Sequence, residues 1–280
     1  MKNSNTMTIA ADGALSDLSQ KVVLVTGSSS GLGRDFCIAL ARQGCQVIAA
    51  ARRTNRLQVL LEELTSLQPH RPHLLLPLDV TAPEPDIDAA VEKSWQALGR
   101  IDVLVNNAGV RGEVKMSLDL DSGEWSKVMT TNLQGVWLMS KAVGRRMRAA
   151  KISGSIINIS STSSLERGLL VGNAAYASSK AALNQLTKVM ALELGKFKIR
   201  VNAVASGIFK SEITDELFQK PWVHKVAEKL VPMQRWGLAN PDMTSLIVLL
   251  ASDSSAYVSG TIFIVDGGYS IAGMLLQSSL

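Results

Sequence analysis

The stretch that decides the fold is Val22-Val-Leu-Val-Thr26-Gly27-Ser-Ser-Ser-Gly31-Leu-Gly33, close to the start of the chain. Its first residues are apolar, as is typical of a short strand buried on both faces of a parallel sheet. Glycines after such a strand let the backbone turn tightly and come close to a pyrophosphate. Helix-compatible residues follow from Arg34 to Gln43, which would place that pyrophosphate at a helix N-terminus. This order of strand, glycine-rich loop and helix predicts a dinucleotide-binding unit.

The remainder of the chain alternates short apolar runs with helix-like segments. Strands are predicted, in chain order, over Val22–Thr26, Gln46–Ala51, Leu74–Leu78, Asp102–Asn106, Ser155–Ser160, Ile199–Ala205 and Thr261–Val265. This alternation predicts an α/β fold with a single Rossmann-type, doubly wound parallel sheet of about seven strands flanked by helices. We expect residues 1–20 to form a flexible extension and residues 21–280 to form one cofactor-binding domain.

Three connecting segments are predicted from their composition. A polar, proline-rich link, Thr81–Asp88, is expected to lead into a helix that ends at Leu98. The segment Ile208–Trp236 is expected to be a mixed, mainly helical insert, and the last helix is expected over Pro241–Leu250.

Length, composition and charge exclude several classes of protein. At 280 residues, with 46% hydrophobic and 19% charged residues, the chain is long enough and apolar enough for one large globular domain. No apolar run approaches the roughly 18 residues that a membrane span needs. The formal charge is +5, but the basic residues are dispersed and are not interleaved with aromatic residues. We therefore expect no nucleic-acid partner, and attribute the charge to attraction for an anionic cofactor or an acidic partner.

Two further expectations concern the cellular compartment and metal binding, and they come from the cysteines, the histidines and the chain termini. Cys37 and Cys45 show no metal-binding spacing and are expected to be buried thiols in a reducing compartment. The three histidines form no ligand pattern, so no metal site is predicted. The N-terminus lacks the apolar core of a secretory signal, and a cytoplasmic location is the default expectation. The final Ser278-Ser279-Leu280 is similar to a degenerate Ser-Lys-Leu peroxisomal address, which keeps the peroxisome as an alternative.

The end of the second predicted strand bears on cofactor choice. An acidic residue there would bond the ribose hydroxyl and select NAD, but the sequence is Ala51-Arg52-Arg53. Arginine matches a 2′-phosphate in charge and in bidentate geometry, which favours NADP(H). The alternative is that the two arginines are simply solvated at the start of a helix.

Tyr176 and Lys180 lie four residues apart in the alanine-rich stretch that follows the fifth predicted strand. This spacing places them on one face of a helix. An ammonium beside a phenol favours the phenolate and lowers the pKa of the tyrosine toward the working range. The pair is therefore a candidate general acid and base, and the alternative is an ordinary surface helix that happens to carry both residues.

The chain resembles the short-chain dehydrogenase/reductase family over roughly residues 20 to 270, in particular its plant-type and bacterial 3-oxoacyl-carrier-protein reductase-like branch. The resemblance rests on several motifs in the right order: Thr26-x3-Gly31-x-Gly33, Asp79, Asn106-Asn107-Ala108-Gly109, Asn132, a serine after the fifth strand, and Tyr176-x3-Lys180.

The resemblance implies four catalytic residues. Tyr176 would donate a proton to a substrate carbonyl as hydride arrives from the nicotinamide, and Ser161 would orient that carbonyl. Lys180 would lower the pKa of the tyrosine and bond the nicotinamide ribose, and Asn132 would hold a proton-relay water. The segment between serine and tyrosine is two residues longer than the family's common length, so counting back from Tyr176 points instead to Ser163.

The resemblance also implies NADP(H) as the cofactor. Asp79 would contact the adenine amine, and Asn107 would line the cofactor groove. The usual Pro-Gly after the sixth strand is Ser206-Gly207 here, which removes a restraint on φ from the loop over the nicotinamide. The implied cofactor-binding residues are Thr26, Gly27, Ser29, Ser30, Gly31, Leu32, Arg52, Arg53, Asp79, Val80, Asn107, Ala108, Gly109, Tyr176, Lys180, Gly207 and Ile208.

These features predict an NADPH-dependent oxidoreductase that reversibly reduces a ketone of an apolar small molecule or an acyl thioester. One alternative is a carrier-protein-linked 3-oxoacyl reductase of fatty acid synthesis, and another is a non-catalytic NADP-binding regulatory protein. Docking of an acidic carrier would need a basic patch, which Arg145, Arg146, Arg148 and Lys151 could supply unless they are only a solvated helix face.

The substrate wall is expected to come from Val110–Met116, Ser163–Asn173 and Ile208–Trp236, with few fixed charges. The apolar residues expected there are Leu165, Leu169, Leu170, Val171, Phe209, Leu217, Phe218 and Trp222. The family commonly forms tetramers through the helices that carry Asn132 and Tyr176, so a homo-oligomer is expected, either a tetramer or a dimer.

Overall fold

The structure is a computed structural model that describes residues 18–210, 214, 218–220 and 222–271. Within these residues the chain forms one parallel sheet with the order β3-β2-β1-β4-β5-β6-β7. Its strands are β1 Val22–Thr26, β2 Gln46–Ala51, β3 Leu74–Pro77, β4 Val103–Asn106, β5 Ser155–Ser161, β6 Arg200–Ser206 and β7 Ile262–Val265. The predicted Rossmann-type sheet is confirmed, and its strand order reverses between β1 and β4, where such sheets bind their ligands.

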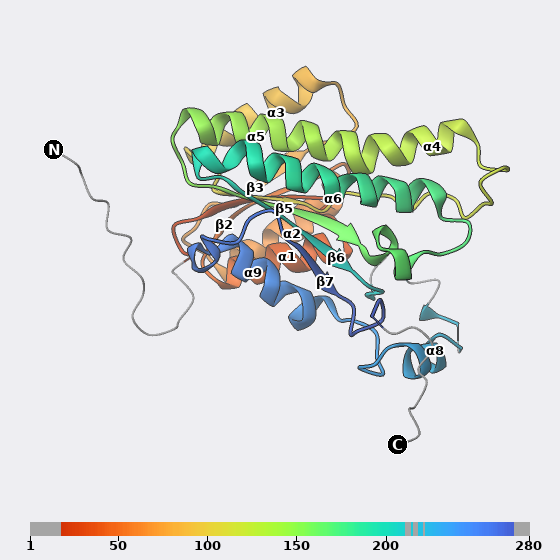
Figure 1. Ribbon diagram of the computed structural model, residues 1–280. Helices are drawn as coiled ribbons and strands as arrows, with labels where there is room; N and C mark the ends of the chain where they lie inside the picture. The colour runs from red at the N-terminus through yellow and green to blue at the C-terminus, as the bar shows by residue number, and fades with distance from the viewer. Residues whose placement is uncertain (1–17, 211–213, 215–217, 221, 272–280) are drawn as a thin grey trace.

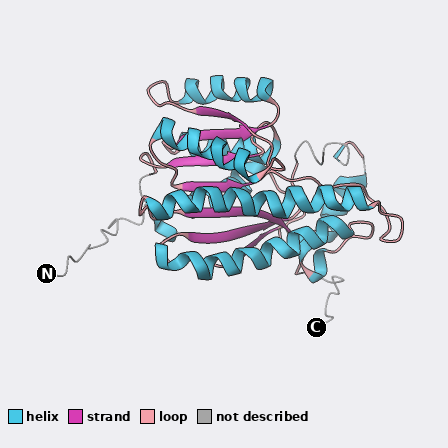
Figure 2. Cartoon of the chain, turned by 90° about the horizontal axis from the view of Figure 1, so that it is seen from above, coloured by secondary structure: helices cyan, strands magenta, loops and turns pink. Residues whose placement is uncertain are grey.

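Helices cover both faces of the sheet (Figure 1). The described α-helices are α1 Gly31–Arg42, α2 Thr54–Leu67, α3 Glu84–Leu98, α4 Ser122–Met129, α5 Gly135–Ala149, α6 Ala174–Leu194, α8 Trp222–Leu230 and α9 Thr244–Ala251. One face carries α1, α2 and α9, and the other carries α3, α5 and α6, which run along the strands when seen from above (Figure 2). None of the described helices is long and apolar enough to cross a membrane.

The fully buried strand β1 explains why the sheet forms between two helical layers. Val23 and Val25 pack into the apolar cluster on the α1, α2 and α9 side, whereas Val22 and Leu24 pack into the cluster on the other side. Because successive side chains point to opposite faces, an entirely apolar strand can satisfy both layers at once. The parallel register then brings all carboxyl ends to one edge of the sheet.

Several element ends differ from the sequence predictions. Helix α1 begins at Gly31 and not at Arg34, so the last glycines of the loop already form its first turn. Helix α3 begins at Glu84, inside the predicted link, because prolines at positions 83 and 85 suit a helix start. The predicted last helix is split into a π-helical turn, Ala239–Met243, which contains a kink at Asn240, followed by α9.

The predicted burial of the two cysteines is confirmed, whereas some other predicted residues lie outside the described part of the chain. Cys37 and Cys45 are both buried. Among the described residues, no group of histidine, cysteine or acidic side chains could hold a metal. Of the insert, α8 is described, whereas Leu217 lies outside the described residues. So do Ser278-Ser279-Leu280 and most of the predicted extension.

Candidate active site

The glycine-rich loop after β1 has a backbone that only glycine can supply at two positions. Gly27 has a φ of +67°, and a Cβ there would lie 2.8 Å from the Cα of Ala108. A Cβ on Gly33 would lie 2.4 Å from the Asn107 side chain. The loop is therefore packed directly against the end of β4, and its outer side is left free for a ligand.

Asn107 and Thr26 hold this loop to the end of β4. The Asn107 side chain donates to the carbonyl oxygens of Thr26 and Gly27, at 3.0 and 3.2 Å. The Thr26 hydroxyl accepts from the backbone N–H groups of Asn107 and Ala108. Thr26 is only 1% exposed, so the structure places it beneath the loop and not on the groove wall.

An elongated groove of about 770 Å³ runs across the carboxyl edge of β1, β2 and β4. Its walls contain the predicted cofactor-binding residues Gly27, Ser29, Ser30, Gly31, Leu32, Arg52, Arg53, Asp79, Val80, Asn107, Ala108 and Gly109. The volume, the glycine cradle and the helix start at Gly31 fit a dinucleotide whose pyrophosphate lies over the loop.

One end of the groove is lined by two arginines and two serines. Arg53 donates from Nε to Ser29 Oγ and from a terminal nitrogen to Ser30 Oγ, at 3.1 and 2.7 Å. Arg52 lies 3.6 Å from the Asp79 carboxylate. Partial burial raises the pKa of Asp79, but hydrogen bonds from Thr81 and the charge of Arg52 outweigh it, so the pKa is lowered. These hydroxyl and guanidinium donors fit a phosphate on the adenosine ribose.

A second, smaller cavity of about 190 Å³ opens from the groove. It contains three of the predicted catalytic residues, Ser161, Tyr176 and Lys180, together with the predicted cofactor residues Gly207 and Ile208. The groove and the cavity share four wall residues, namely Leu32, Asn107, Gly109 and Val110. A dinucleotide in the groove would therefore reach the wall of the cavity that contains the tyrosine.

Tyr176 and Lys180 lie on the first two turns of α6, as their spacing predicts. The Lys180 Nζ lies 5.7 Å from the centre of the Tyr176 ring and donates to the carbonyl oxygen of Ile159 at 2.7 Å. Burial lowers the pKa of Lys180 to about 8. Burial also raises the pKa of Tyr176, although a hydrogen bond with Ser161 and the charge of Arg111 lower it. In this structure, therefore, desolvation raises the pKa of Tyr176, and the groups that lower it are Ser161 and Arg111, not the lysine as expected.

Asn132 is fully buried in a π-helical turn, Thr130–Gln134, between α4 and α5. Its side chain accepts from the Val110 N–H and donates to the Val110 carbonyl, both at 2.8 Å. It also donates to the Ser179 hydroxyl, which in turn donates to the Tyr176 carbonyl at 2.7 Å. Asn132 thus links the loop after β4 to the turn that carries Tyr176. Ser179 was not predicted, although its spacing of three from Tyr176 was a usable signal.

Ser161 is the last residue of β5 and pairs in register with Ser206 of β6. Its hydroxyl accepts from the Ser163 N–H at 3.1 Å, and it touches Tyr176 through the hydrogen bond noted above. The Ser163 hydroxyl faces Asn173 instead, at a distance of 3.5 Å. Both serines line the cavity, but Ser161 is the one that shares a hydrogen bond with the tyrosine.

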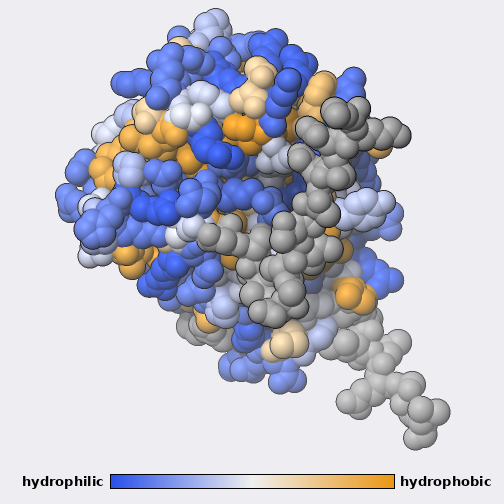
Figure 3. All heavy atoms as spheres, turned by 90° about the vertical axis from the view of Figure 1, so that its left-hand side faces the viewer, coloured by the Kyte–Doolittle hydropathy of each residue, from blue (hydrophilic) through white to orange (hydrophobic). Residues whose placement is uncertain are grey.

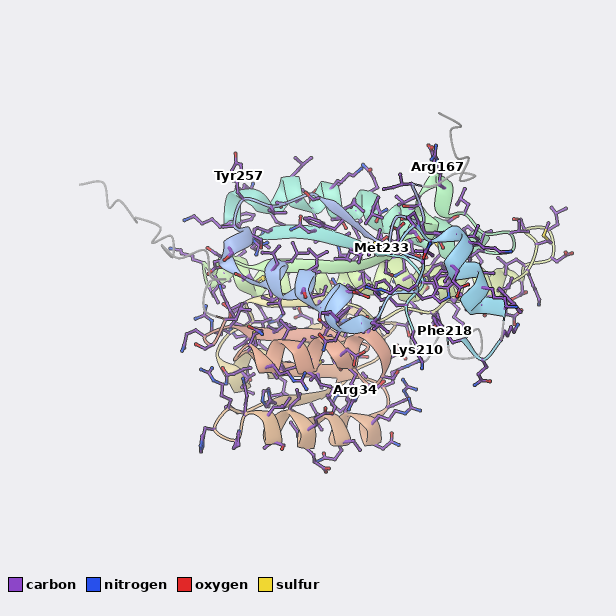
Figure 4. The ribbon with its side chains drawn as sticks, turned by 90° about the horizontal axis from the view of Figure 1, so that it is seen from below. Arg34, Arg167, Lys210, Phe218, Met233 and Tyr257 are labelled. Carbon is purple, nitrogen blue, oxygen red and sulfur yellow. The ribbon has the colours of Figure 1, made fainter. Side chains whose placement is uncertain are left out.

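The longer segment between Ser161 and Tyr176 forms a bulge at the rim of the cavity. It contains a short helical turn, Glu166–Gly168, and is bridged at Asn173 to Lys115 of the loop after β4. The labelled Arg167 of this bulge and Lys210 of the insert lie at the same end of the molecule, away from Tyr257 (Figure 4).

The cavity wall differs in two respects from the predicted apolar wall. Of the apolar residues expected there, Leu170 and Phe209 line the cavity, whereas Leu169 and Val171 point largely to solvent. The wall also contains a charged residue that sequence reasoning missed, Arg111.

The proposed carrier-docking patch is not beside this cavity. Arg145 and Arg146 lie near the C-terminus of α5 and pair with acidic residues of α3. That end of α5 lies at the amino edge of the sheet, opposite the cavity, on the side of the molecule shown in Figure 3. The structure therefore favours a solvated helix face over a carrier-binding site for these residues.

A dinucleotide groove that leads to a half-buried tyrosine and a buried lysine defines an oxidoreductase that uses a nicotinamide cofactor. A family model described as short chain dehydrogenase matches residues 21–222, and the chain belongs to that family.

The relatives cover nearly the whole chain and differ in activity. A 3-oxoacyl-acyl-carrier-protein reductase of Thermotoga maritima is 35% identical over 90% of this chain and 98% of its own length. A 5-keto-D-gluconate 5-reductase of Escherichia coli is 36% identical over 92% of this chain and 98% of its own. The crystal structure of a gluconate 5-dehydrogenase from Burkholderia cenocepacia, in complex with NADP and tartrate, has a TM-score of 0.84 and 29% identity, and the match covers 91% of this chain and 97% of that one. The overall fold and family are therefore shared across several substrate classes.

Proposed function

We propose that this protein is an NADPH-dependent oxidoreductase that reversibly reduces a ketone to an alcohol, with Tyr176 as general acid and base. The observation that carries the proposal is the shared wall of the groove and the cavity at Leu32, Asn107, Gly109 and Val110. A cofactor that occupies the groove would bring its nicotinamide end to the residues that handle the carbonyl.

The preference for NADPH is supported by the adenosine end of the groove. Arg53 is already hydrogen-bonded to Ser29 and Ser30, so its guanidinium is oriented without further loss of side-chain freedom. β2 ends at Ala51, without the acidic side chain that would repel a 2′-phosphate. NADP is the cofactor named for the gluconate 5-dehydrogenase structure from Burkholderia cenocepacia.

NADPH would supply the hydride, and the residues of this chain would handle the proton and the carbonyl. Because burial raises the pKa of Tyr176, its phenol is protonated at neutral pH and can donate to a developing alkoxide. Ser161, at the end of β5, would donate a hydrogen bond to the same oxygen. Lys180 would hold the ribose next to the nicotinamide, while its present partner, the Ile159 carbonyl, fixes the direction of its side chain.

Asn132 would act mainly through the backbone that it holds. Its two hydrogen bonds to Val110 fix the strand-to-loop junction that forms part of the cavity wall. Gly109 lies beside it, and a Cβ there would lie 3.2 Å from Asn132 Oδ1, so Asn132 would have to shift by a few tenths of an ångström.

A small-molecule ketone is favoured over an acyl thioester carried by a protein. The similarity to a 3-oxoacyl-acyl-carrier-protein reductase keeps the second candidate open, but the basic patch considered for a carrier lies at the far edge of the sheet. A non-catalytic NADP-binding protein is disfavoured, because Tyr176, Lys180 and Ser161 line one cavity.

A homo-oligomer is proposed on the basis of an apolar groove on the α4, α5 and α6 face. Trp125 and Trp137 are 40% and 41% exposed there, and Leu186 of α6 lines the same groove. Leu183 and Met190 of α6 are buried within the chain. We propose a cytoplasmic location, with the peroxisome as the alternative.

The proposal is tested by mixing purified protein with NADPH and a panel of ketones, and following loss of NADPH absorbance. The panel contains short oxo acids, their methyl esters, apolar cyclic ketones and 3-oxoacyl thioesters of coenzyme A. We expect oxidation of NADPH that depends on the ketone. Tight NADPH binding without turnover of any member would instead favour the non-catalytic alternative.

A further inference from the structure

The described walls of the cavity that contains Tyr176 carry positive charge. Among the described residues that line it, two are cationic, Arg111 and Lys180, and none is acidic. Lys180 is already directed at the Ile159 carbonyl and, under the proposed function, at the cofactor. The proposed function gives Arg111 no comparable role.

Arg111 is not neutralised by a neighbouring carboxylate within the described part of the chain. Two acidic residues close to this turn are engaged with lysines, because Glu113 pairs with Lys115 at 2.6 Å and Glu124 pairs with Lys127 at 3.0 Å. A guanidinium left without an anion at the wall of a small cavity is available to a ligand.

The backbone on both sides of Arg111 is fixed. Val110, just before it, is held by two hydrogen bonds to the buried Asn132 side chain. Gly112, just after it, has a φ of +76°, and a Cβ there would lie 2.6 Å from the Val128 side chain. The next N–H, of Glu113, donates to the Glu124 carboxylate at 3.1 Å. The exposed side chain of Arg111 therefore projects from a turn whose backbone is held on both sides, so a ligand would have to order the side chain but not the loop.

The charge of Arg111 also acts inside the cavity, since it lowers the pKa of Tyr176. A ligand that places its carbonyl at Tyr176 and Ser161 is thus within the field of the guanidinium. The other walls offer the hydroxyl of Ser163 and the apolar side chains of Leu170 and Phe209. This combination suits a short, partly apolar molecule with an anionic end.

We infer that Arg111 binds a carboxylate of the substrate, so that the preferred substrates are small oxo acids and not neutral ketones. This inference rests on the proposed function for the reaction, but the anion site itself can be tested without turnover. The cavity wall was expected to carry few fixed charges, whereas this inference gives one of its charged residues a specific contact with the substrate.

The binding test uses saturated carboxylates, which cannot be reduced. Butanoate, pentanoate and hexanoate, each beside its primary amide, are titrated into the protein–NADPH complex by calorimetry. Wild type is expected to bind at least one acid more tightly than its amide, and Arg111→Gln to weaken that acid roughly 10- to 100-fold while leaving the amide unchanged. Arg111→Lys is expected to retain part of the preference, since the charge remains but the bidentate geometry is lost. Lys210→Gln, an exposed cation at the same end of the molecule, is the matched control and should behave as wild type.

The turnover test uses short oxo acids and their methyl esters with NADPH. Arg111→Gln should lower kcat/KM for the acids by a similar factor and change little for the esters, because Tyr176 stays protonated when a charge that lowers its pKa is removed. If acids and amides bind equally, or if Arg111→Gln affects both alike, the anion site is overturned, whatever the turnover. If carboxylates bind through Arg111 but neither acids nor esters oxidise NADPH, the anion site stands and the proposed reaction fails.

Discussion

At the residue scale, Tyr176 depends on its surroundings for its protonation state. Its side chain is half-buried at the cavity wall, and burial raises its pKa above the ordinary value. A tyrosine in this state carries the proton that reduction of a ketone requires, but its raised pKa makes it a weaker acid than an ordinary phenol; oxidation of the alcohol would be favoured at higher pH.

Ser161 and Ser163 are expected to contribute unequally to binding of the substrate carbonyl. Ser161→Ala should cost about 2–4 kcal/mol of transition-state stabilisation, since it removes an oxyanion-type donor beside Tyr176. Ser163→Ala should cost distinctly less, because its hydroxyl faces Asn173. The comparison is of kcat/KM for both variants on one substrate. A larger loss for Ser163→Ala would mean that the interval counted back from the tyrosine, and not the end of the strand, identifies the catalytic serine.

Lys180 should make the free energy of unfolding depend on pH. Its folded pKa of about 8 lies below the ordinary 10.5, so between these values the unfolded chain holds more protons and stability rises with pH. The slope from this group is at most about 1.4 kcal/mol per pH unit. Denaturant unfolding of wild type and Lys180→Met across this window should show the slope in wild type alone, in the absence of cofactor. Parallel curves would show that Lys180 is not desolvated as the structure has it.

At the element scale, the glycine-rich loop and the ends of β2 and β4 act as one unit. The loop is held to β4 through Thr26 and Asn107, and to β2 through Arg53 and the two loop serines. Selection between NADPH and NADH should therefore depend on the residues at the end of β2. Substitutions there should leave the glycine-rich loop in place.

Arg52→Ala is expected to weaken NADPH by about 1.5–3 kcal/mol and to leave NADH nearly unchanged, because a charge-assisted contact to the 2′-phosphate is lost. Arg53→Ala should do the same and also loosen Ser29 and Ser30. Ala51→Asp should shift preference toward NADH, since its carboxylate would repel the phosphate. The test is to measure the dissociation constants of NADPH and NADH for each variant, with Lys93→Ala on α3 as the control. An equal loss for both cofactors in the arginine variants would refute NADPH selection by these residues.

The strands could be predicted from the sequence because their signals are local. A short run such as Val22–Thr26, apolar except for its last residue, is typical of a strand buried on both faces. Its predicted bounds match those of β1. Two features were missed: the start of α3, where the prolines at positions 83 and 85 were assigned to a link although they suit a helix start, and the kink at Asn240. The roles of Ser179 and Arg111 were missed because they depend on tertiary contacts, between Ser179 and Asn132 and between Arg111 and the rest of the cavity wall, that join segments distant in the chain.

At the scale of the whole molecule, the groove on the α4, α5 and α6 face bears on assembly. Trp125 and Trp137 leave much apolar area in water, which a second copy of the chain would cover. Sedimentation velocity should show wild type as a dimer or tetramer and Trp137→Glu as a smaller species. Trp222→Glu, on the exposed side of α8, is the control and should keep the wild-type size. A wild type that sediments as a monomer would contradict this use of the groove.

The most direct test of the whole account follows NADPH bound to wild type and to Tyr176→Phe, each mixed with a ketone that wild type reduces. The account predicts equal NADPH affinity for the two proteins, because the phenol hydroxyl is not needed to bind the cofactor in the groove. It also predicts rapid oxidation of NADPH in wild type and essentially none in Tyr176→Phe, because only the proton donor is absent. Robust reduction of the ketone by Tyr176→Phe would contradict the account.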